Sequence, residues 1–268
     1  MHGTGNLADR HRRARRAALA LAVALAAAPT LAVDDSPPSG SEADSWHAPE
    51  FTDPRLAARR AADAGGQATH MRWKLTGVLG WIAGLFVPNH GDALLTAEPV
   101  PGDRTRIQLL ITAPRRDGEY FLYGADVDSD SGAVAAAWSA HAFRKDREAR
   151  AQQIEEPNVV DMASAVYLLA RDPPKKKSVW SIWNRGELFA AEIEPLPPET
   201  RRVGDARVAV RGYAVRGASV PGLRSFEEKL LFYFTAGTAP QPVEIVGTRG
   251  PLRLRLRVVE PESADPDD

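Results

Sequence analysis

The sequence predicts a mainly β protein, in which a curled antiparallel sheet or half-open β-barrel packs around one amphipathic helix. Three observations lead to this prediction. Apolar and polar residues alternate with a period of two in many short segments after Met71. Turn residues separate these segments at intervals of about ten residues, which is typical of antiparallel sheets that curl or close. One segment, at about 158–170, instead has the spacing of an α-helix.

The N-terminal segment 1–33 predicts a cleavable signal peptide. Five arginines between Arg10 and Arg16 precede an uninterrupted apolar run, 17–28, and Pro29 ends that run before Thr30-Leu31-Ala32. The run is too short to remain as a membrane anchor. Because the chain has no cysteine, it cannot carry the lipid-modified cysteine of a bacterial lipoprotein. We therefore expect a periplasmic protein without a stable transmembrane span after cleavage.

Composition divides the remaining chain into three parts. Residues 34–66 are acidic and rich in Pro and Ser, which predicts a disordered spacer. A short helix is expected within it at 53–64, because Pro54 suits a first helical turn and Gly65-Gly66 would end the helix. We expect a single β-rich domain at 67–261 and an acidic disordered tail at 262–268.

The charge balance and the lack of cysteine exclude several classes of function. Residues 1–33 hold five Arg and one Asp, so the remaining chain has 29 basic against 34 acidic residues and a formal charge of −5. That balance argues against a nucleic-acid partner, which requires a basic footprint. The absence of cysteine excludes disulfides, thiol nucleophiles and thiolate metal sites.

Period-two segments predict the strands. In the first segment, 73–87, every second residue from Trp73 onward is mostly apolar, as expected for one buried strand face. Gly77, Gly80 and Gly84 would bend or bulge this strand. Between two later segments, Asn184-Arg185-Gly186 is a hairpin signal. The other expected strands are 105–111, 119–126, 134–143, 179–183, 187–194, 207–216, 227–235, 243–247 and 252–259.

The segment 158–170 is the one expected helix of the β domain. Asn158 can cap the free amides of its first turn, and Asp161 would lie in that turn, where the helix dipole favours a carboxylate. Apolar residues from Val159 to Ala170 share one face. Asp172-Pro173-Pro174 would end the helix. A single amphipathic helix in such a protein packs on an open sheet face or fills the mouth of a barrel.

These features resemble a family of exported bacterial proteins known as domain of unknown function 3108, over about 71–259. The resemblance rests on Trp73-Lys74-Leu75-Thr76-Gly77, on the helix motif Asp161, Ser164 and Tyr167, and on paired strands around Pro242-Val243. It differs at the turn 236–240, which lacks the family's acidic residues, and after Tyr167, where the family often has an arginine. The resemblance implies an envelope protein with a curved sheet and one helix, and it implies no established activity.

The residues indicate no catalytic site, no metal site and no cofactor. The histidines lack the spacing of a zinc-protease helix, and the segment 126–132 lacks the glycine and the acid that a calcium loop needs. Ser164 stands one turn after Asp161 but has no neighbouring His as a base, which favours a capping Asp with a small packing Ser. Together with Tyr167, these residues form the helix motif of the resemblance, which we interpret as structural. Paired carboxylates for glycoside cleavage remain an alternative, from Glu187, Glu192, Glu194, Glu227, Glu228 and Glu244.

The aromatic residues and one arginine ladder are the candidate ligand-binding residues. Aromatic side chains are numerous enough to line an apolar groove on a concave sheet face as well as to fill a core. Arg253, Arg255 and Arg257 alternate with leucines and would stand on one strand face about 7 Å apart. They would bind an anionic glycan or lipid headgroup, or pair with acids on a neighbouring strand. The predicted ligand-binding residues are Trp73, Trp81, Tyr167, Trp183, Phe232, Arg253, Arg255 and Arg257.

Three functions are compatible with this sequence. The first is a non-enzymatic periplasmic envelope protein that binds a hydrophobic or amphipathic ligand on the concave face of its sheet, with lipid, glycan or another envelope protein as its partner. The second is a hydrolase that acts on cell-wall or surface polysaccharide through two facing carboxylates. The third is a structural module that binds another protein through an open sheet edge.

Overall fold

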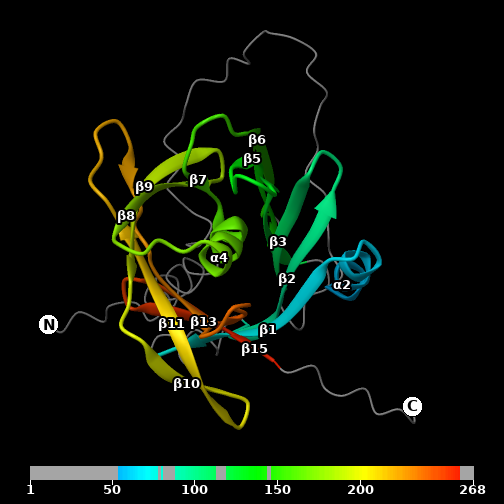
Figure 1. The fold of residues 1–268 in the computed structure, drawn as a ribbon, viewed down its shortest axis with the longest axis vertical. Helices are drawn as coiled ribbons and strands as arrows, with labels where there is room; N and C mark the ends of the chain where they lie inside the picture. Colours follow the sequence, from blue (N-terminus) through cyan, green and yellow to red (C-terminus); the bar gives the residue numbers. More distant parts are fainter. Residues whose placement is uncertain (1–53, 78–79, 81–87, 113–118, 144–145, 260–268) are drawn as a thin grey trace, which may run out of the picture.

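The computed structural model describes residues 54–77, 80, 88–112, 119–143 and 146–259. They form one mainly antiparallel sheet that curls around a helix (Figure 1). The elements, in chain order, are α2 (Pro54–Asp63), β1 (Gln67–Thr76), β2 (His90–Val100), β3 (Arg104–Thr112), β4 (Tyr120–Asp128), β5 (Val134–Phe143), β6 (Asp146–Gln153), β7 (Val159–Val160), α4 (Met162–Arg171), β8 (Ser178–Asn184), β9 (Glu187–Pro195), β10 (Glu199–Val203), β11 (Ala206–Gly217), β12 (Arg224–Ser225), β13 (Lys229–Thr235), β14 (Pro242–Arg249) and β15 (Leu252–Val258).

The order of strands makes the sheet a half-open barrel. It runs β6-β5-β4-β3-β2-β1-β15-β14-β13-β11-β9-β8-β7, with β10 on β11 and β12 on β9. The first and last described strands, β1 and β15, pair with each other in the middle of this path, with Trp73 opposite Leu256. The expectation of a mainly β fold with a curled sheet and one enclosed helix is confirmed.

The two ends of the sheet approach each other and meet through side chains. Trp183 Nε1 on β8 donates a hydrogen bond to Gln152 Oε1 on β6 over 2.9 Å. Arg185, in the turn after β8, forms an ion pair with Glu148 on β6. The chain itself crosses this seam, because β6 leads directly into β7, which pairs with β8 in parallel.

The interior of the curled sheet is filled by α4 and by inward side chains from both halves. In Figure 1, α4 lies in the middle of the curl. Val166 and Leu169 of α4 are buried in the same cluster as Leu109 of β3 and Phe232 of β13. Each fully buried side chain of this size contributes about 1.5–3 kcal/mol of burial free energy. The amphipathic face of α4 therefore joins the two halves of the sheet.

Helix α4 begins three residues later than it would if Asn158 were its N-cap. Val159–Val160 form β7, Asn158 has φ 59°, and α4 runs Met162–Arg171 rather than from about 158 to 170. Asp161 is the N-cap, because its carboxylate accepts the backbone N–H groups of Ala163 and Ser164 at 3.2 and 2.7 Å. Ser164 Oγ accepts the Asp161 N–H in return, at 2.9 Å, which completes a capping box. Val159 and Val160 pair with β8 as a strand and therefore do not join the helix.

The first strand is shorter than the period-two pattern predicts. β1 ends at Thr76, and Gly77 follows with φ 84°, in the left-handed region. The predicted continuation over 81–87, including Trp81, lies outside the described residues. The hairpin signal agrees with the structure, because Arg185 and Gly186 both have positive φ between β8 and β9.

Five strands, β2, β6, β7, β10 and β12, are not among the expected segments, and the two longest of them, β2 and β6, have a physical reason. β2 is buried on both faces, since Leu95 faces the interior and Leu94 lies under α2. β6 has no large apolar residue and is exposed along almost its whole length at the end of the sheet. Its charged residues protect an edge that would otherwise attract another strand.

The helix α2 packs on the outside of the sheet, against β1 and β2. Ala57 and Ala61 are buried, and Ala57 belongs to an outer cluster with Leu94, Leu110 and Trp138. A short helix was expected at 53–64 within a disordered spacer, and α2 lies at Pro54–Asp63, where it covers part of the convex face of the sheet. No helix in the described residues is long and apolar enough to cross a membrane.

We predict that Asp161→Ala lowers the free energy of unfolding by about 2 kcal/mol, because two amides of α4 lose their acceptor inside the barrel. Asp161→Asn keeps an acceptor oxygen and is expected to cost less than about 1 kcal/mol. Urea denaturation followed by tryptophan fluorescence measures both. An equal loss in the two variants would show that the charge, rather than the cap hydrogen bonds, stabilises the helix start.

Candidate functional site

Three of the predicted ligand-binding aromatics are core residues. Trp73, Trp183 and Phe232 are 8%, 2% and 1% exposed and belong to the interior cluster around α4. The indole N–H of Trp73 donates to the Thr112 carbonyl at 2.7 Å, so it is satisfied within the protein. These side chains fill the concave face instead of lining an open groove on it. Trp81 lies outside the described residues.

Tyr167 is the predicted aromatic that lines an open pocket. It projects from α4 into a cavity of about 240 Å³ between the C-terminal half of α4, strands β1–β3 and the β13–β14 turn. We call this cavity the slot. It is lined by Gln67, Thr69, Leu95, Ala97, Ile107, Val166, Tyr167, Ala170, Arg171, Pro240, Gln241 and Pro242.

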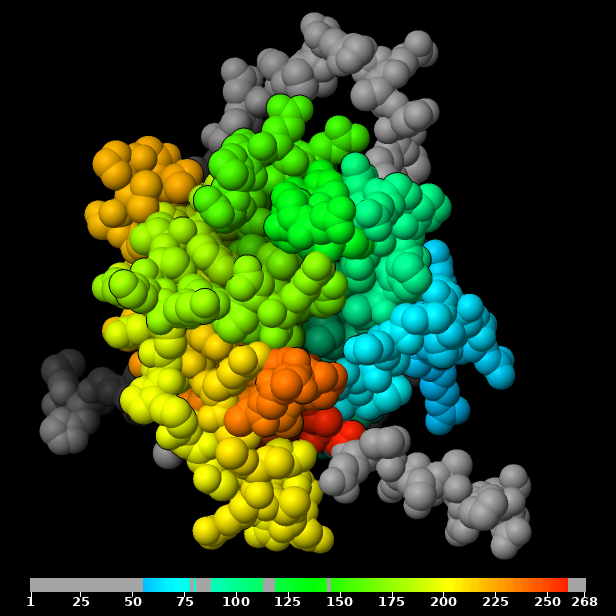
Figure 2. Space-filling model, viewed as in Figure 1, coloured from blue at the N-terminus to red at the C-terminus, as the bar shows by residue number. Residues whose placement is uncertain are grey.

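The slot has an apolar interior and a polar rim. Figure 2 shows a hollow between the cyan β1, the yellow-green α4 and the orange turn that leads into β14. Leu95, Ile107 and Val166 form its deep wall, and all three are buried. Gln67, Thr69 and Gln241 supply polar atoms among the lining residues. This combination suits the apolar part of an amphipathic ligand.

A cationic group stands at the C-terminal end of α4, beside the slot. Arg171 Nη1 lies 3.4 Å from the Tyr167 hydroxyl, to which it donates. On the other side, Arg211 Nη2 of β11 donates to the Ala170 carbonyl at 3.0 Å. The guanidinium groups complement the negative end of the helix dipole and fix the end of α4 that forms the wall of the slot.

Sequence reasoning missed most of the slot. Leu95 and Ala97 come from β2, which is buried on both faces and therefore lacks the alternation of apolar and polar residues that predicts a strand. The rim from Pro240 to Pro242 follows a turn for which the sequence indicated no binding role. The signal that could have found the slot is the pair of prolines around Gln241, which favours a rigid, close turn.

The arginine ladder lies on the opposite face of the sheet from the aromatics. Leu252, Leu254 and Leu256 of β15 point into the core, so the alternate arginines point outward. Trp73, Trp183 and Phe232 therefore lie on the inner face of the sheet, and Arg253, Arg255 and Arg257 lie on the outer face. A sheet with a period of two cannot place neighbouring residues of one strand on the same face.

The outward arginines surround one buried carboxylate. Glu244 of β14 is 2% exposed, and its Oε1 accepts from Arg257 Nε at 2.8 Å. Arg255 Nε lies 2.8 Å from the same oxygen, and Arg201 of β10 donates to Oε2. The guanidinium of Arg201 also stacks on the Tyr233 ring, 3.5 Å from its centroid. Of the two roles considered for the ladder, pairing with acids on a neighbouring strand is therefore observed for Arg255 and Arg257.

The Asp161 and Ser164 pair lies inside the barrel as a helix cap. Ser164 is fully buried, and its Oγ donates to the Asp161 carboxylate at 2.6 Å. Burial raises the pKa of Asp161, while the hydrogen bonds from Ser164 and Ala163 act in the opposite direction. The Ser164 hydroxyl is buried and takes part in the helix cap, so the arrangement supports a structural role.

The acids weighed for glycoside cleavage form ion pairs with basic side chains. Glu244 is enclosed by the arginines described above. The other pairs are Glu187–Arg224, Glu192–Lys177, Glu194–Arg216, Glu227–Arg249 and Glu228–Arg249. Burial raises the pKa of Glu228, and Arg249 opposes that shift. None of these six described residues lines the slot. No group of three or more potential ligands for a metal ion occurs in the described part of the chain.

Comparisons with known proteins concern the architecture. No family model matches the chain. No curated protein matches it either. Among solved structures, a β-barrel-like protein of domain of unknown function DUF1849 from Brucella abortus has a TM-score of 0.38 at 6% identity, covering 72% of this chain and 95% of its own.

Two mycobacterial structures are also similar. The lipoprotein LppX from Mycobacterium tuberculosis has a TM-score of 0.29 at 11% identity, covering 77% of this chain and 91% of its own. LprF from Mycobacterium bovis has a TM-score of 0.29 at 10% identity, covering 76% and 90%. A function for this chain has to be derived from its own site geometry.

We predict that Glu244→Gln lowers the free energy of unfolding by about 3 kcal/mol, because three guanidinium groups lose their buried counter-charge. The matched control Glu194→Gln breaks the exposed pair with Arg216 and is expected to cost less than about 1 kcal/mol. Chemical denaturation at two salt concentrations measures both, and salt should reduce the cost of Glu244→Gln. Equal losses in the two variants would contradict the central role of Glu244.

Proposed function

We propose that this protein is an exported, non-enzymatic binding protein of the cell envelope, and that its slot holds the apolar part of an amphipathic ligand. The observation that supports this function best is the apolar interior of the slot, about 240 Å³ in volume, with Arg171 at its rim. A cavity of this size holds a short acyl chain or one apolar side chain. The charge at the rim favours an anionic or polar end outside.

The surroundings of the slot support reversible binding at this place. One wall is a helix, α4, which has a fixed N-terminal cap and whose C-terminal end is hydrogen-bonded to Arg211. The opposite wall is the sheet, and the rim is the short turn before β14. A ligand would therefore enter a largely preformed site, which limits the entropic cost of binding.

The proposed location rests on the sequence. The basic head and apolar run within residues 1–33 are typical of a signal peptide, and the absence of cysteine removes a lipid anchor at the cleavage site. The resemblance to domain of unknown function 3108, itself a hypothesis, implies an envelope protein as well. An amphipathic ligand is available in that compartment as lipid or as the lipid-modified part of another protein.

We predict that the purified protein binds decanoate and that Ala170→Phe weakens this binding at least tenfold, because the ring occupies the slot. The matched control is Ala209→Phe, at an exposed position of β11 outside the slot, which should bind decanoate like the unchanged protein. Isothermal titration calorimetry measures the affinities, and acetate serves as a ligand without an apolar chain.

Two results would contradict the proposed function. The first is equal decanoate affinity in the Ala170→Phe and Ala209→Phe variants, which would place binding elsewhere. The second is native mass spectrometry of gently purified protein without a bound amphiphile, together with no decanoate binding in solution. Circular dichroism of each variant establishes that the fold is kept.

A further inference from the structure

The outer face of the sheet carries a cluster of arginines that the slot does not use. We call Arg201, Arg255 and Arg257, with Glu244 between them, the arginine cluster. They come from β10, β15 and β14, three strands brought together by the sheet order. Glu244 is almost fully buried, while the three guanidinium groups remain partly open to solvent, at 21%, 28% and 52% exposure.

The arginine cluster has more donors than its carboxylate can accept. Three guanidinium groups carry five N–H donors each, whereas one carboxylate offers about four acceptor positions. Arg255 shows this excess, because its Nε is buried and lies 2.8 Å from Glu244 Oε1 without an aligned hydrogen bond. The donors available to an oxygen-rich ligand are those of the exposed part of the cluster, chiefly Arg257, because Arg201 Nε and Nη2 already donate to Glu199.

Positive charge is also in excess around the arginine cluster. Strand register places Arg72 and Lys74 of β1 opposite Arg257 and Arg255, on the same outward face, and Arg253 follows along β15. Six basic residues (Arg72, Lys74, Arg201, Arg253, Arg255 and Arg257) face three acids, Asp92, Glu199 and Glu244. Burial and, after it, the neighbouring positive charges lower the pKa of Arg255, while Glu244 acts in the opposite direction.

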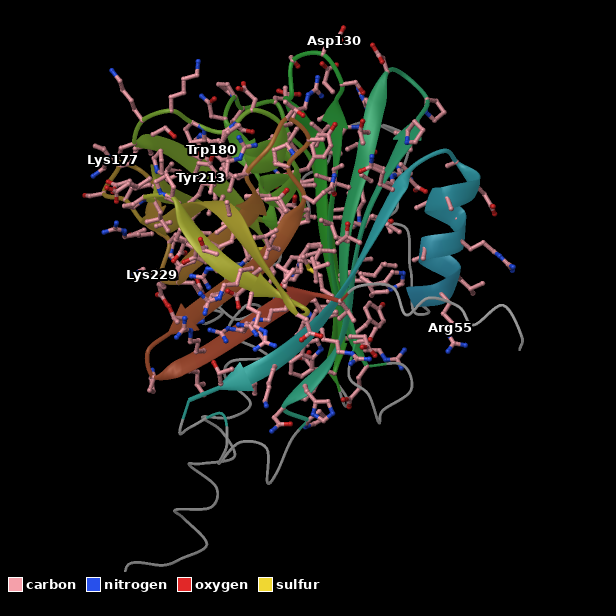
Figure 3. All side chains as sticks on the ribbon, turned by 60° about the horizontal axis from the view of Figure 1, so that its bottom comes forward. Arg55, Asp130, Lys177, Trp180, Tyr213 and Lys229 are labelled. Atoms are coloured by element: carbon pink, nitrogen blue, oxygen red, sulfur yellow. The ribbon has the colours of Figure 1, made fainter. Side chains whose placement is uncertain are left out.

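A hollow of about 410 Å³ adjoins the arginine cluster. Its lining is mostly polar and includes Arg201, Arg202, Gly204, Glu244 and Arg257. Figure 3 shows nitrogen-tipped side chains gathered along the orange-red strands on this side of the molecule. The hollow is large enough for a phosphoryl group and part of the molecule attached to it.

We propose that the arginine cluster is a binding site for a phosphoryl group, carried by free phosphate or by the headgroup of an anionic phospholipid. A phosphoryl group offers several oxygens to the planar donors of arginine and a charge that matches the surplus on this face. Glu244 acts as a positioning residue, since it holds the guanidinium groups from the core side and keeps them turned toward the hollow.

This site is independent of the slot. The slot opens between α4 and the inner face of β1–β3, whereas the arginine cluster lies on the outer face of β14 and β15. An acyl chain in the slot and a phosphoryl group on the arginine cluster are therefore separate binding events. Ala170→Phe should leave phosphate binding unchanged, so failure of one proposal is distinguishable from failure of the other.

The test compares Arg257→Gln with Arg216→Gln in the full processed chain. Both changes remove one positive charge from a partly exposed guanidinium that pairs with a glutamate, but Arg216 lies on β11 beside Glu194. Calorimetry with inorganic phosphate should show binding that weakens about tenfold in Arg257→Gln and less than twofold in Arg216→Gln. Raising the salt concentration should weaken binding in the unchanged protein.

Vesicle flotation separates the two sources of the phosphoryl group. Binding to phosphatidylglycerol vesicles but not to phosphatidylcholine vesicles, lost in Arg257→Gln, would assign a lipid headgroup, and binding of inorganic phosphate alone would assign the free anion. Absence of both kinds of binding, or equal loss in Arg257→Gln and Arg216→Gln, overturns the proposal. If Arg257→Gln does not fold, Arg253→Gln replaces it and should weaken binding about threefold.

Discussion

The structure depends on one constraint, which is that a strongly curled sheet must fill its own interior. The inward side chains of β1, β3, β13 and β15 form one buried cluster with Val166 and Leu169 of α4, so the helix fills part of the interior of the curl. The capping box of Asp161 and Ser164 allows the chain to turn from β7 directly into α4 without leaving amides unpaired. The side chains at the seam, Trp183 with Gln152, then hold the two ends of the sheet together.

The same constraint explains where space remains. The helix has only ten residues, and its C-terminal end lies near the turn between β13 and β14. The slot lies at that end, between Ala170 and Arg171 on one side and β1–β3 on the other. The proposed binding site therefore lies beside the C-terminal end of the helix that fills the barrel, and the cap at the opposite end of α4 fixes where that helix begins.

The outer face follows a different principle. On the inside, apolar burial holds the strands together, whereas on the outside a buried glutamate of β14 organises arginines from two other strands, β10 and β15. A buried ion pair adds little stability by itself, because desolvation offsets the attraction. The surplus of guanidinium groups over carboxylates is therefore hard to explain by stability alone, and binding of an oxyanion gives it a role.

The sequence by itself determined the class of fold, most strand positions and the single enclosed helix, because period-two and 3.6-residue patterns report directly which side of an element is buried. It also indicated that Asp161 and Ser164 are structural. Only the tertiary structure decided that Trp73 and Phe232 fill the core, that the slot forms around Tyr167, and that Glu244 joins Arg201 to Arg257. These groupings join residues that are distant in the chain, and local patterns report which face of a strand a residue occupies but not which other strands share that face.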